Sequence, residues 1–252
     1  MAISAPFALV TGGARRVGRA IVEDLAANGW AVAIHYGHSH DDAHELAAAI
    51  GGRGGNAVSV QGDLTDATTP VRLVAEANRA LGPVTLLVNN ASIFEKDTVG
   101  QLDAGLWQKQ MTVNLMAPVF LADAFARQLP DGTEGNVVNL LDQRIWRPTP
   151  SHFSYQISKS ALHAATVTLA QALAPRIRVN GIAPGPVLPN IHAADDTAFR
   201  KHVAGLPLKR QPDLADFGRT VRYFVENRSV TGQVVALDGG QHLEWRAPTS
   251  TE

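Results

Sequence analysis

The sequence predicts a single-domain α/β fold, in which a doubly wound parallel sheet carries helices on both faces. Short apolar runs alternate with longer segments of helical periodicity, and turns containing Gly or Asn separate them. Parallel strands cannot be joined by a tight hairpin, so this alternation requires helical crossovers. No change of composition and no block of charge divides the 252 residues, and we therefore expect one domain over 1–252.

The first half of the chain contains four predicted strands. Phe7–Val10 is an apolar run that ends in a Gly-containing turn, and residues at helical spacing follow it as far as Asn28-Gly29. The second strand is Ala31–Tyr36, after which Ser39 is a candidate N-cap for a helix that ends in Gly51–Gly55. The same unit then repeats with a strand at Ala57–Gln61, a helix at Val71–Leu81 and a strand at Val84–Val88.

The second half continues the alternation with longer helices. The elements expected there are helices around Leu106–Leu129 and Phe153–Leu173, and strands at Asn136–Leu141 and Ile177–Ile182. The following loop, 183–198, is long and contains several prolines, which is typical of loops that cover a ligand. We therefore expect a substrate lid at about 183–205 that orders when ligands bind.

Composition excludes several classes of partner and of chemistry. The 22 Lys and Arg residues balance 23 Asp and Glu residues, so no broad charged surface for nucleic acid or an anionic membrane is expected. The longest uncharged helical stretch, Ser160 to Pro175, is too short to span a bilayer. The absence of Cys excludes disulfides and thiolate chemistry, and the His residues lack metal-ligand spacing. These features favour a small-molecule partner, no metal and a cytoplasmic location, since the N-terminus lacks a targeting signal.

A glycine-rich turn predicts a dinucleotide site. The segment from Gly12 to Gly18 joins the first strand to the first helix, where free N–H groups and the helix dipole attract a pyrophosphate. No carboxylate stands at the end of the second strand before Asp41, so nothing there selects the ribose hydroxyl of NAD. Arg15 and Arg16 instead offer charge-assisted hydrogen bonds to a 2′-phosphate, with Ser39 as a further donor. The expected cofactor is therefore NADP(H).

Tyr155 and Lys159 lie four residues apart on a predicted helix, so their side chains share one face. A phenol with a pKa of about 10 is a poor proton donor or acceptor at neutral pH. A neighbouring ammonium group favours the phenolate, and we expect Lys159 to lower the pKa of Tyr155. The pair is thus a candidate acid–base device.

Several motifs occur together in an order that resembles the short-chain dehydrogenase/reductase family. They are Thr11-Gly12…Gly18, Asp63-Leu64, Asn89-Asn90-Ala91, Asn114, Tyr155-x-x-x-Lys159 and Pro184-Gly185. The resemblance spans nearly the whole chain and implies a Rossmann-type enzyme in which Tyr155 donates a proton. It further implies that Lys159 holds the nicotinamide ribose and that Asn114 sustains a water relay. The tail Val234 to Trp245 resembles the family's last strand, which implies a homotetramer.

Two departures from the family pattern resemble the pteridine reductases within it. Arg16 replaces the middle glycine of the turn, and Asp142 replaces the serine usually found 13 residues before the tyrosine. Ser92 and Phe94 also match residues that line the pterin site of that subgroup, and His35-Tyr36 with Ser39 match it after the second strand. A flat pterin can stack on the Phe94 ring, while an acid at position 142 suits protonation of a ring nitrogen.

The resemblance and the turn together give a full set of expected site residues. The catalytic residues are Asn114, Asp142, Tyr155 and Lys159. The cofactor-binding residues are Gly12, Arg15, Arg16, Val17, Gly18, His35, Tyr36, Ser39, Asp63, Leu64, Asn90, Ala91, Ser92, Tyr155, Lys159, Pro184, Gly185 and Val187. The substrate-binding residues are Arg16, Ser92, Phe94, Asp142 and Tyr155.

The predicted activity is NADPH-dependent reduction of a pteridine of the dihydrobiopterin, dihydromonapterin or dihydrofolate type. One alternative is a short-chain carbonyl or 3-oxoacyl reductase, against which Asp142 and Phe94 argue. A more distant alternative is a non-catalytic NADP(H)-sensing regulator. The intact pair Tyr155 and Lys159 argues against that alternative, because a sensor needs no acid–base device.

Overall fold

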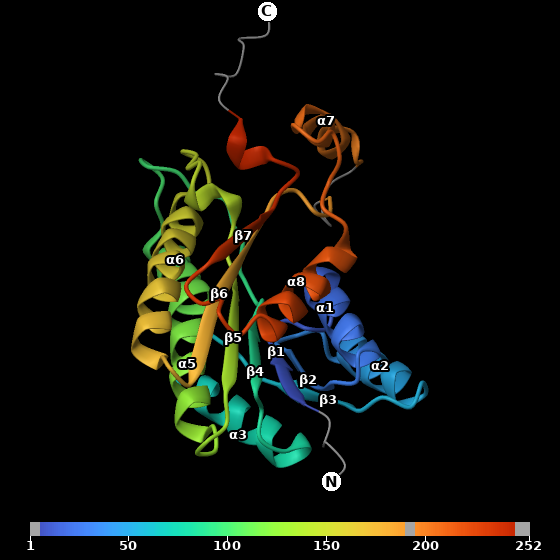
Figure 1. Ribbon diagram of the computed structural model, residues 1–252. Coiled ribbons are helices and arrows are strands. Elements are labelled where there is room, and N and C mark those ends of the chain that lie inside the picture. Colours follow the sequence, from blue (N-terminus) through green and yellow to red (C-terminus); the bar gives the residue numbers. More distant parts are fainter. Residues whose placement is uncertain (1–5, 190–194, 245–252) are drawn as a thin grey trace, which may run out of the picture.

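The computed structural model describes residues 6–189 and 195–244, and it contains a seven-stranded parallel sheet in the order β3-β2-β1-β4-β5-β6-β7. The strands are β1 (Phe7–Val10), β2 (Ala31–Tyr36), β3 (Ala57–Gln61), β4 (Leu86–Asn89), β5 (Gly135–Leu140), β6 (Ile177–Pro184) and β7 (Val234–Leu237). The order reverses between β1 and β4, as in a doubly wound sheet. The predicted fold class is confirmed, with all strands parallel and helices on both faces (Figure 1).

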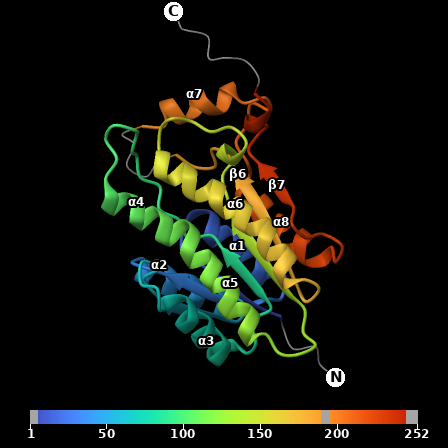
Figure 2. The same ribbon diagram turned by 90° about the vertical axis from the view of Figure 1, so that its left-hand side faces the viewer.

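The helices divide between the two faces of this sheet. They are α1 (Arg16–Ala27), α2 (His40–Gly51), α3 (Thr69–Leu81), α4 (Ala104–Met111), α5 (Ala117–Gln128), α6 (Phe153–Leu173), α7 (Thr197–Gly205) and α8 (Leu214–Glu226). One core cluster joins α1, α2 and α8 to one face, and a second joins α3, α5 and α6 to the other. Figure 2 shows α4 and α5 end to end on the second face, with α6 beside them.

The strands alternate between these two cores. Ala8 and Val10 of β1 belong to the cluster with α1, whereas Leu9 between them belongs to the cluster with α5. Successive residues of a strand are therefore buried on opposite faces of the sheet, which explains why the strands are largely apolar runs with little polar alternation.

Three helices depart from the predicted pattern, and one of them, α7, begins inside the loop expected at 183–198. The expected long helix at Leu106–Leu129 is divided by the π-helical segment η1 (Thr112–Met116), which carries Asn114. Helix α8 was not predicted, although its buried residues Phe217, Val221 and Phe224 recur at helical spacing. This helix packs beside α1, where the guanidinium of Arg222 lies 2.7 Å from the Asp24 carboxylate.

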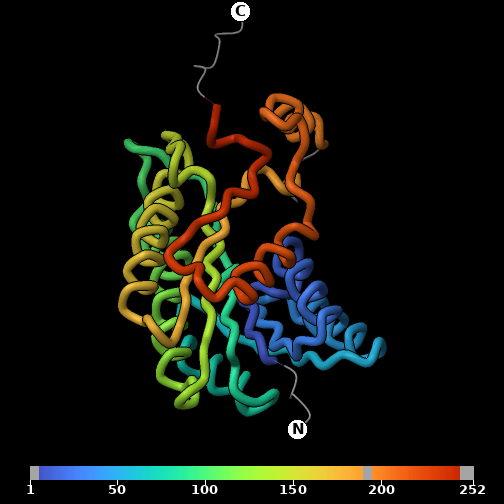
Figure 3. Tube along the Cα trace, viewed as in Figure 1, coloured from blue at the N-terminus to red at the C-terminus, as the bar shows by residue number. Residues whose placement is uncertain are grey.

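The carboxyl ends of β1, β4, β5 and β6 lie at one edge of the sheet, as parallel pairing requires. The chain trace in Figure 3 leaves β6 and reaches α7 beyond this edge, where η3 (Gln241–Leu243) also lies. No residue of α7 is buried, so this helix stands apart from both cores.

The expected lid falls partly on residues 190–194, which lie outside the described residues, as does Trp245. No helix among residues 6–189 and 195–244 has the length and apolar character needed to cross a bilayer.

Candidate active site

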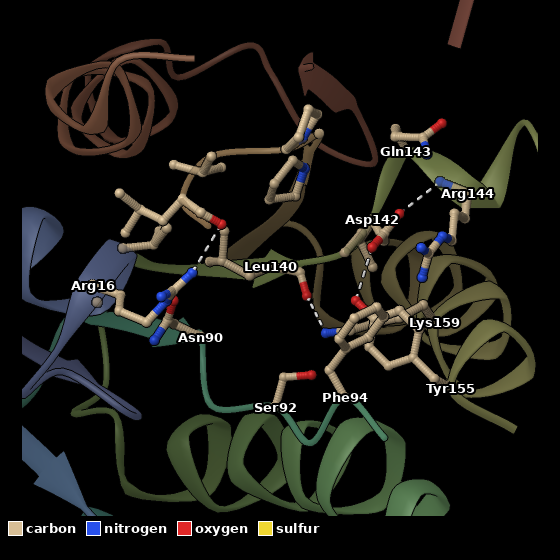
Figure 4. Close-up of a pocket in the computed structure, with 18 of the residues that line it drawn as sticks. Arg16, Asn90, Ser92, Phe94, Leu140, Asp142, Gln143, Arg144, Tyr155 and Lys159 are labelled. Carbon is tan, nitrogen blue, oxygen red and sulfur yellow. Dashed lines mark hydrogen bonds between the residues drawn. The ribbon is translucent and has the colours of Figure 1, made fainter. Parts of the chain in front are cut away.

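A cavity of about 620 Å³ opens at the carboxyl ends of the central strands, and it brings together most of the predicted site residues (Figure 4). Those lining it are Gly12, Arg15, Arg16, Val17, Gly18, Asn90, Ala91, Ser92, Phe94, Asp142, Tyr155, Lys159, Pro184, Gly185 and Val187. Those that do not line it are His35, Tyr36, Ser39, Asp63, Leu64 and Asn114. The cavity is thus built mainly from the turns that follow β1, β4, β5 and β6.

The glycine turn is held from beneath by a buried histidine. Nδ1 of His35 accepts a hydrogen bond from the Gly12 N–H at 3.1 Å, and Nε2 donates to the Gly62 carbonyl at 3.0 Å. Burial lowers the pKa of His35 to about 4, so the ring is neutral and both nitrogens are occupied. In contrast to the expected cofactor contact, His35 supports the turn instead of lining the cavity. A Cβ on Gly18 would lie 2.1 Å from the Gly12 carbonyl oxygen, which explains the glycine there.

The two arginines of the turn have different surroundings. Nε of Arg15 donates to the Asp42 carboxylate at 2.7 Å, so a carboxylate from α2 reaches the predicted phosphate region. The Arg16 guanidinium donates to the carbonyl oxygens of Leu188 and Pro189 at 3.2 and 3.1 Å, which ties the turn to the loop after β6. Arg16 adopts the left-handed conformation with φ 53°, which glycine adopts at lower cost and which accounts for the family's glycine at this position.

Tyr155 and Asp142 form a hydrogen-bonded pair in the cavity wall. The Tyr155 hydroxyl donates to Oδ2 of Asp142 at 2.9 Å, and the other carboxylate oxygen accepts the Arg144 backbone N–H at 2.8 Å. Burial and the adjacent carboxylate raise the pKa of Tyr155 well above its ordinary value. The predicted lowering of this pKa is therefore wrong, because desolvation and Asp142 outweigh the ammonium group.

Lys159 is buried one helical turn beyond Tyr155 and points into the same cavity (Figure 4). Its Nζ donates to the Leu140 carbonyl at 2.7 Å and lies 5.8 Å from the centroid of the Tyr155 ring. Burial lowers the pKa of Lys159 to about 8, close to the operating pH of most enzymes. The predicted shared face is confirmed, while the direct partner of the ammonium group is a backbone carbonyl.

Asn114 lies behind the cavity wall, where its side-chain amide hydrogen-bonds two of the elements that form the wall. Its Oδ1 accepts hydrogen bonds from the Ile93 N–H and the Ser92 hydroxyl at 2.8 and 3.1 Å. Its Nδ2 donates to the Ile93 carbonyl and to the Ser158 hydroxyl at 2.9 and 3.1 Å. The amide thus joins the loop after β4 to helix α6, and its part in a water relay stays a prediction.

Phe94 is half exposed in the cavity and is bordered by aromatic and cationic groups. Its ring is stacked on the His152 imidazole, with centroids 4.2 Å apart and planes 6° from parallel. The Tyr155 ring meets it edge to face at 4.7 Å, and the Arg144 guanidinium carbon lies 5.0 Å from its centroid. His152 stands in the left-handed region with φ 57° immediately before α6.

The predicted adenosine residues lie further along the same sheet edge. Tyr36 is buried at the end of β2, where it contacts the rings of His40 and His44. Asp63 follows β3, and its carboxylate accepts the Thr65 N–H at 2.9 Å. Their contact with an adenosine stays a prediction.

Sequence reasoning missed several residues that line the cavity. They are Leu140, Leu141, Gln143, Arg144, Pro186, Leu188, Phe199, His202 and Gln241. Gln143 and Arg144 follow Asp142 directly, so their proximity to the predicted acid was a usable signal. Phe199 and His202 fall inside the lid expected at 183–205, but no pattern singled out these two side chains, because α7 reaches the cavity through tertiary structure alone.

Comparison with known proteins agrees with this geometry. Residues 6–198 match the short chain dehydrogenase family. The chain is 33% identical to pteridine reductase 1 of Leishmania tarentolae, over 95% of this chain and 97% of the relative. Two solved structures are also similar, both of FolM alternative dihydrofolate reductase 1 with NADP. The Brucella canis structure has a TM-score of 0.93 and 53% identity, covering 100% of both chains. The Brucella suis structure has a TM-score of 0.91 and 55% identity, covering 96% of this chain and 98% of that one.

The range matched by the family, 6–198, contains the glycine turn, the Tyr155-x-x-x-Lys159 pair and the ends of β1, β4, β5 and β6 that form the cavity. These similarities confirm the family and the pteridine reductase likeness predicted from the motifs. The chain belongs to the short-chain dehydrogenase/reductase family.

Proposed function

We propose that the protein is an NADPH-dependent reductase that reduces a C=N bond of a pteridine of the dihydrobiopterin, dihydromonapterin or dihydrofolate type. The observation that carries this proposal is the Tyr155 hydroxyl 2.9 Å from the Asp142 carboxylate, in place of the serine common in the family. Reduction of a C=N bond requires a proton at nitrogen, and this pair holds one at the cavity wall. The relatives named for pteridine and dihydrofolate reduction support the same assignment.

The residues of the glycine turn fit a dinucleotide. No side chain caps the start of the twelve-residue helix α1, and its first turn contains no acidic residue. Its N-terminus therefore offers N–H groups and a positive dipole end to a pyrophosphate. Asn90 and Ala91 lie against the turn on the other side, and Asn90 Nδ2 donates to the Thr11 and Gly12 carbonyls. NADPH bound here would supply the hydride, and Arg15 would bind its 2′-phosphate in competition with Asp42.

The proton in this proposal comes from the Tyr155–Asp142 pair. The raised pKa of Tyr155 keeps the phenol protonated at neutral pH, while Asp142 accepts its hydrogen bond. The pair passes that proton to the ring nitrogen as the neighbouring carbon receives the hydride. Lys159, whose pKa is about 8, would place a positive charge 5.8 Å from the centroid of the Tyr155 ring as the phenol loses its proton, and would bind the nicotinamide ribose.

The ring would lie against Phe94, whose stacked contact with a pterin contributes about 0.5–1.5 kcal/mol beyond burial of area. His152 already covers one part of this ring, so the pterin uses the remaining exposed surface or displaces the imidazole. Arg16 and Ser92 would hydrogen-bond the edge of the pterin from the glycine turn and from the loop after β4.

Steady-state NADPH oxidation with dihydrobiopterin, dihydrofolate and a panel of ketones and 3-oxoacyl thioesters tests the proposal. Tyr155→Phe is the blank, and Asp142→Ser restores the serine of the carbonyl reductases. We expect the wild type to turn over pteridines and Asp142→Ser to lose that activity. Turnover of ketones or 3-oxoacyl substrates alone would favour the carbonyl reductase, and no turnover of any substrate would favour the NADP(H)-sensing regulator.

We also propose a homotetramer in the cytoplasm and a substrate lid at about 183–205. Exposed apolar side chains on α5 and α6, namely Phe120, Ile157 and Val167, support assembly through this face. Light scattering that gives the mass of a monomer would contradict the tetramer. Equal hydrogen-exchange rates over the lid with and without ligands would contradict ordering of that segment.

A further inference from the structure

We propose that Arg144, assisted by Gln143, binds a carboxylate on the substituent of the pteridine, so that the enzyme prefers a folate-type substrate over an unconjugated pterin. This inference rests on the proposed function and adds a residue that determines specificity. It assigns a task to two side chains that the proton-transfer chemistry does not use.

Arg144 is fixed beside the reacting groups by its backbone. Its N–H donates to Oδ1 of Asp142 at 2.8 Å, and its carbonyl accepts from Nε2 of Gln156 at 2.9 Å. The guanidinium carbon lies 5.0 Å from the Phe94 ring centroid and 5.9 Å from that of Tyr155. The position of the cation is thus coupled to the surface on which the pterin would lie.

Apart from these two aromatic rings, the guanidinium group has no counter-ion and no hydrogen-bond acceptor within the part of the chain that the structure describes. No carboxylate there lies within 4.0 Å of it, and its Nη1 is buried without a hydrogen bond. Arg15 and Arg147, by contrast, are paired with Asp42 and Glu244. Burying part of a cation without a counter-ion costs desolvation free energy. A ligand that brings an anion to the guanidinium group offsets that cost.

The neighbouring groups favour an anion over a cation or a neutral tail. Gln143 is 5% exposed and lines the cavity, and its Nε2 donates no hydrogen bond to any described residue. Its amide N–H groups can therefore donate to a carboxylate in the cavity. Asp142 is the one carboxylate among the described residues of the cavity wall, and both of its oxygens already accept hydrogen bonds.

The place of Arg144 identifies the substrate, and not the cofactor, as the source of that anion. The pyrophosphate would lie at the N-terminus of α1, beside Arg16. Figure 4 shows Arg144 and Arg16 on opposite sides of the cavity, with Asp142 and Tyr155 on the Arg144 side. A pterin beside Tyr155 and Phe94 would direct its substituent away from the turn, and a glutamyl carboxylate on that substituent matches the planar donor fork of Arg144.

The test compares two substrates that share the ring and differ in charge, dihydrofolate and dihydrobiopterin. For Arg144→Gln we expect KM for dihydrofolate to rise at least about 10-fold, and KM for dihydrobiopterin to change less than about 2-fold, because only the first carries a carboxylate. Arg144→Lys should recover part of the dihydrofolate affinity by its charge. Arg79→Gln, an exposed arginine on α3, is the matched control, and unchanged NADPH binding shows that each variant is folded.

Two results would overturn the inference: an equal loss with both substrates, which would place Arg144 on the pterin ring, or no change with either. Equilibrium binding of dihydrofolate to Tyr155→Phe, with and without Arg144→Gln, keeps the test independent of turnover. If the wild type reduces no pteridine but this binding depends on Arg144, the carboxylate site stands and the proposed reaction fails. If neither activity nor Arg144-dependent binding is found, both fail.

Discussion

The buried ammonium group of Lys159 destabilises the folded protein, and its replacement by methionine should raise the free energy of unfolding at neutral pH. The ammonium group is 2% exposed and its carbonyl partner, Leu140, compensates burial only in part. Methionine has a similar length and no charge, so Lys159→Met removes the buried charge with little change in packing.

The magnitude follows from the pKa. A fall from 10.5 to about 8 means that the charged form is less favourable in the folded than in the unfolded protein. At 1.36 kcal/mol per pH unit, this cost is about 3 kcal/mol at pH 7. The variant loses the hydrogen bond to Leu140, which costs about 1 kcal/mol. We therefore expect a net gain of about 2 kcal/mol in the free energy of unfolding, or about 4–8 °C in Tm for a domain of this size.

The same pKa fixes how this gain depends on pH. Below pH 8 both folded and unfolded wild type hold the proton on Lys159, so the whole cost is present. Between pH 8 and 10.5 only the unfolded state holds it, so the wild type becomes more stable as pH rises. The advantage of Lys159→Met should therefore fall by about 3 kcal/mol between pH 7 and pH 10.5, from about +2 to about −1 kcal/mol, so that the wild type is the more stable protein at the upper end of that range.

Urea unfolding of both proteins at pH 7, 8.5 and 10 measures this difference, with the exposed Lys201→Met as control. Other groups titrate equally in the wild type and in the variants, and their effect cancels in the comparison. A Lys159→Met protein that is less stable than wild type at pH 7, or a difference that does not vary with pH, would refute the reasoning.

Three further predictions concern the phenol and the glycine turn. Tyr155→Phe should lower kcat by about 10²–10⁴-fold through loss of the proton donor, with NADPH affinity within about 3-fold of wild type by fluorescence titration; an active variant would contradict the assignment. Arg15→Ala should lower the ratio of NADPH to NADH affinity by about 10-fold, and an unchanged ratio would exclude Arg15 from the 2′-phosphate site. Arg16→Gly should be about 1 kcal/mol more stable than Arg16→Ala in denaturant unfolding, because only glycine accepts φ 53° without strain; equal stability would argue against that strain.

The sheet and the cavity could be predicted because the information lies in local sequence. Runs such as Ala31–Tyr36 are buried throughout and apolar except for His35, since both faces of a central parallel strand are covered. The turns that follow such strands meet at one edge of the sheet, which is why motifs as distant as Gly12 and Tyr155 line one cavity.

Features that depend on tertiary contacts could not be read in this way. Asp42 is 27 residues from Arg15, and only the packing of α2 brings its carboxylate to the turn. Asp142, Tyr155 and Lys159 were all predicted at the site, but the pKa of Tyr155 rises because burial and the carboxylate outweigh the ammonium group, and their balance depends on the folded geometry. Helix α8 carried a visible apolar period at Phe217 and Val221, so its omission was an error of interpretation.

The central claim, that this cavity transfers hydride to a pteridine carbon while the Tyr155–Asp142 pair protonates the adjacent nitrogen, can be tested by isotope tracing. The protein is incubated with NADPH deuterated at the transferred position of C4 and with a dihydropteridine, and the tetrahydropteridine is analysed by mass spectrometry. We predict one deuterium on a ring carbon of the product with the wild type, and a yield of labelled product at least about 100-fold lower with Tyr155→Phe in the same time. A product without deuterium, or the same labelled yield from Tyr155→Phe, would contradict the account.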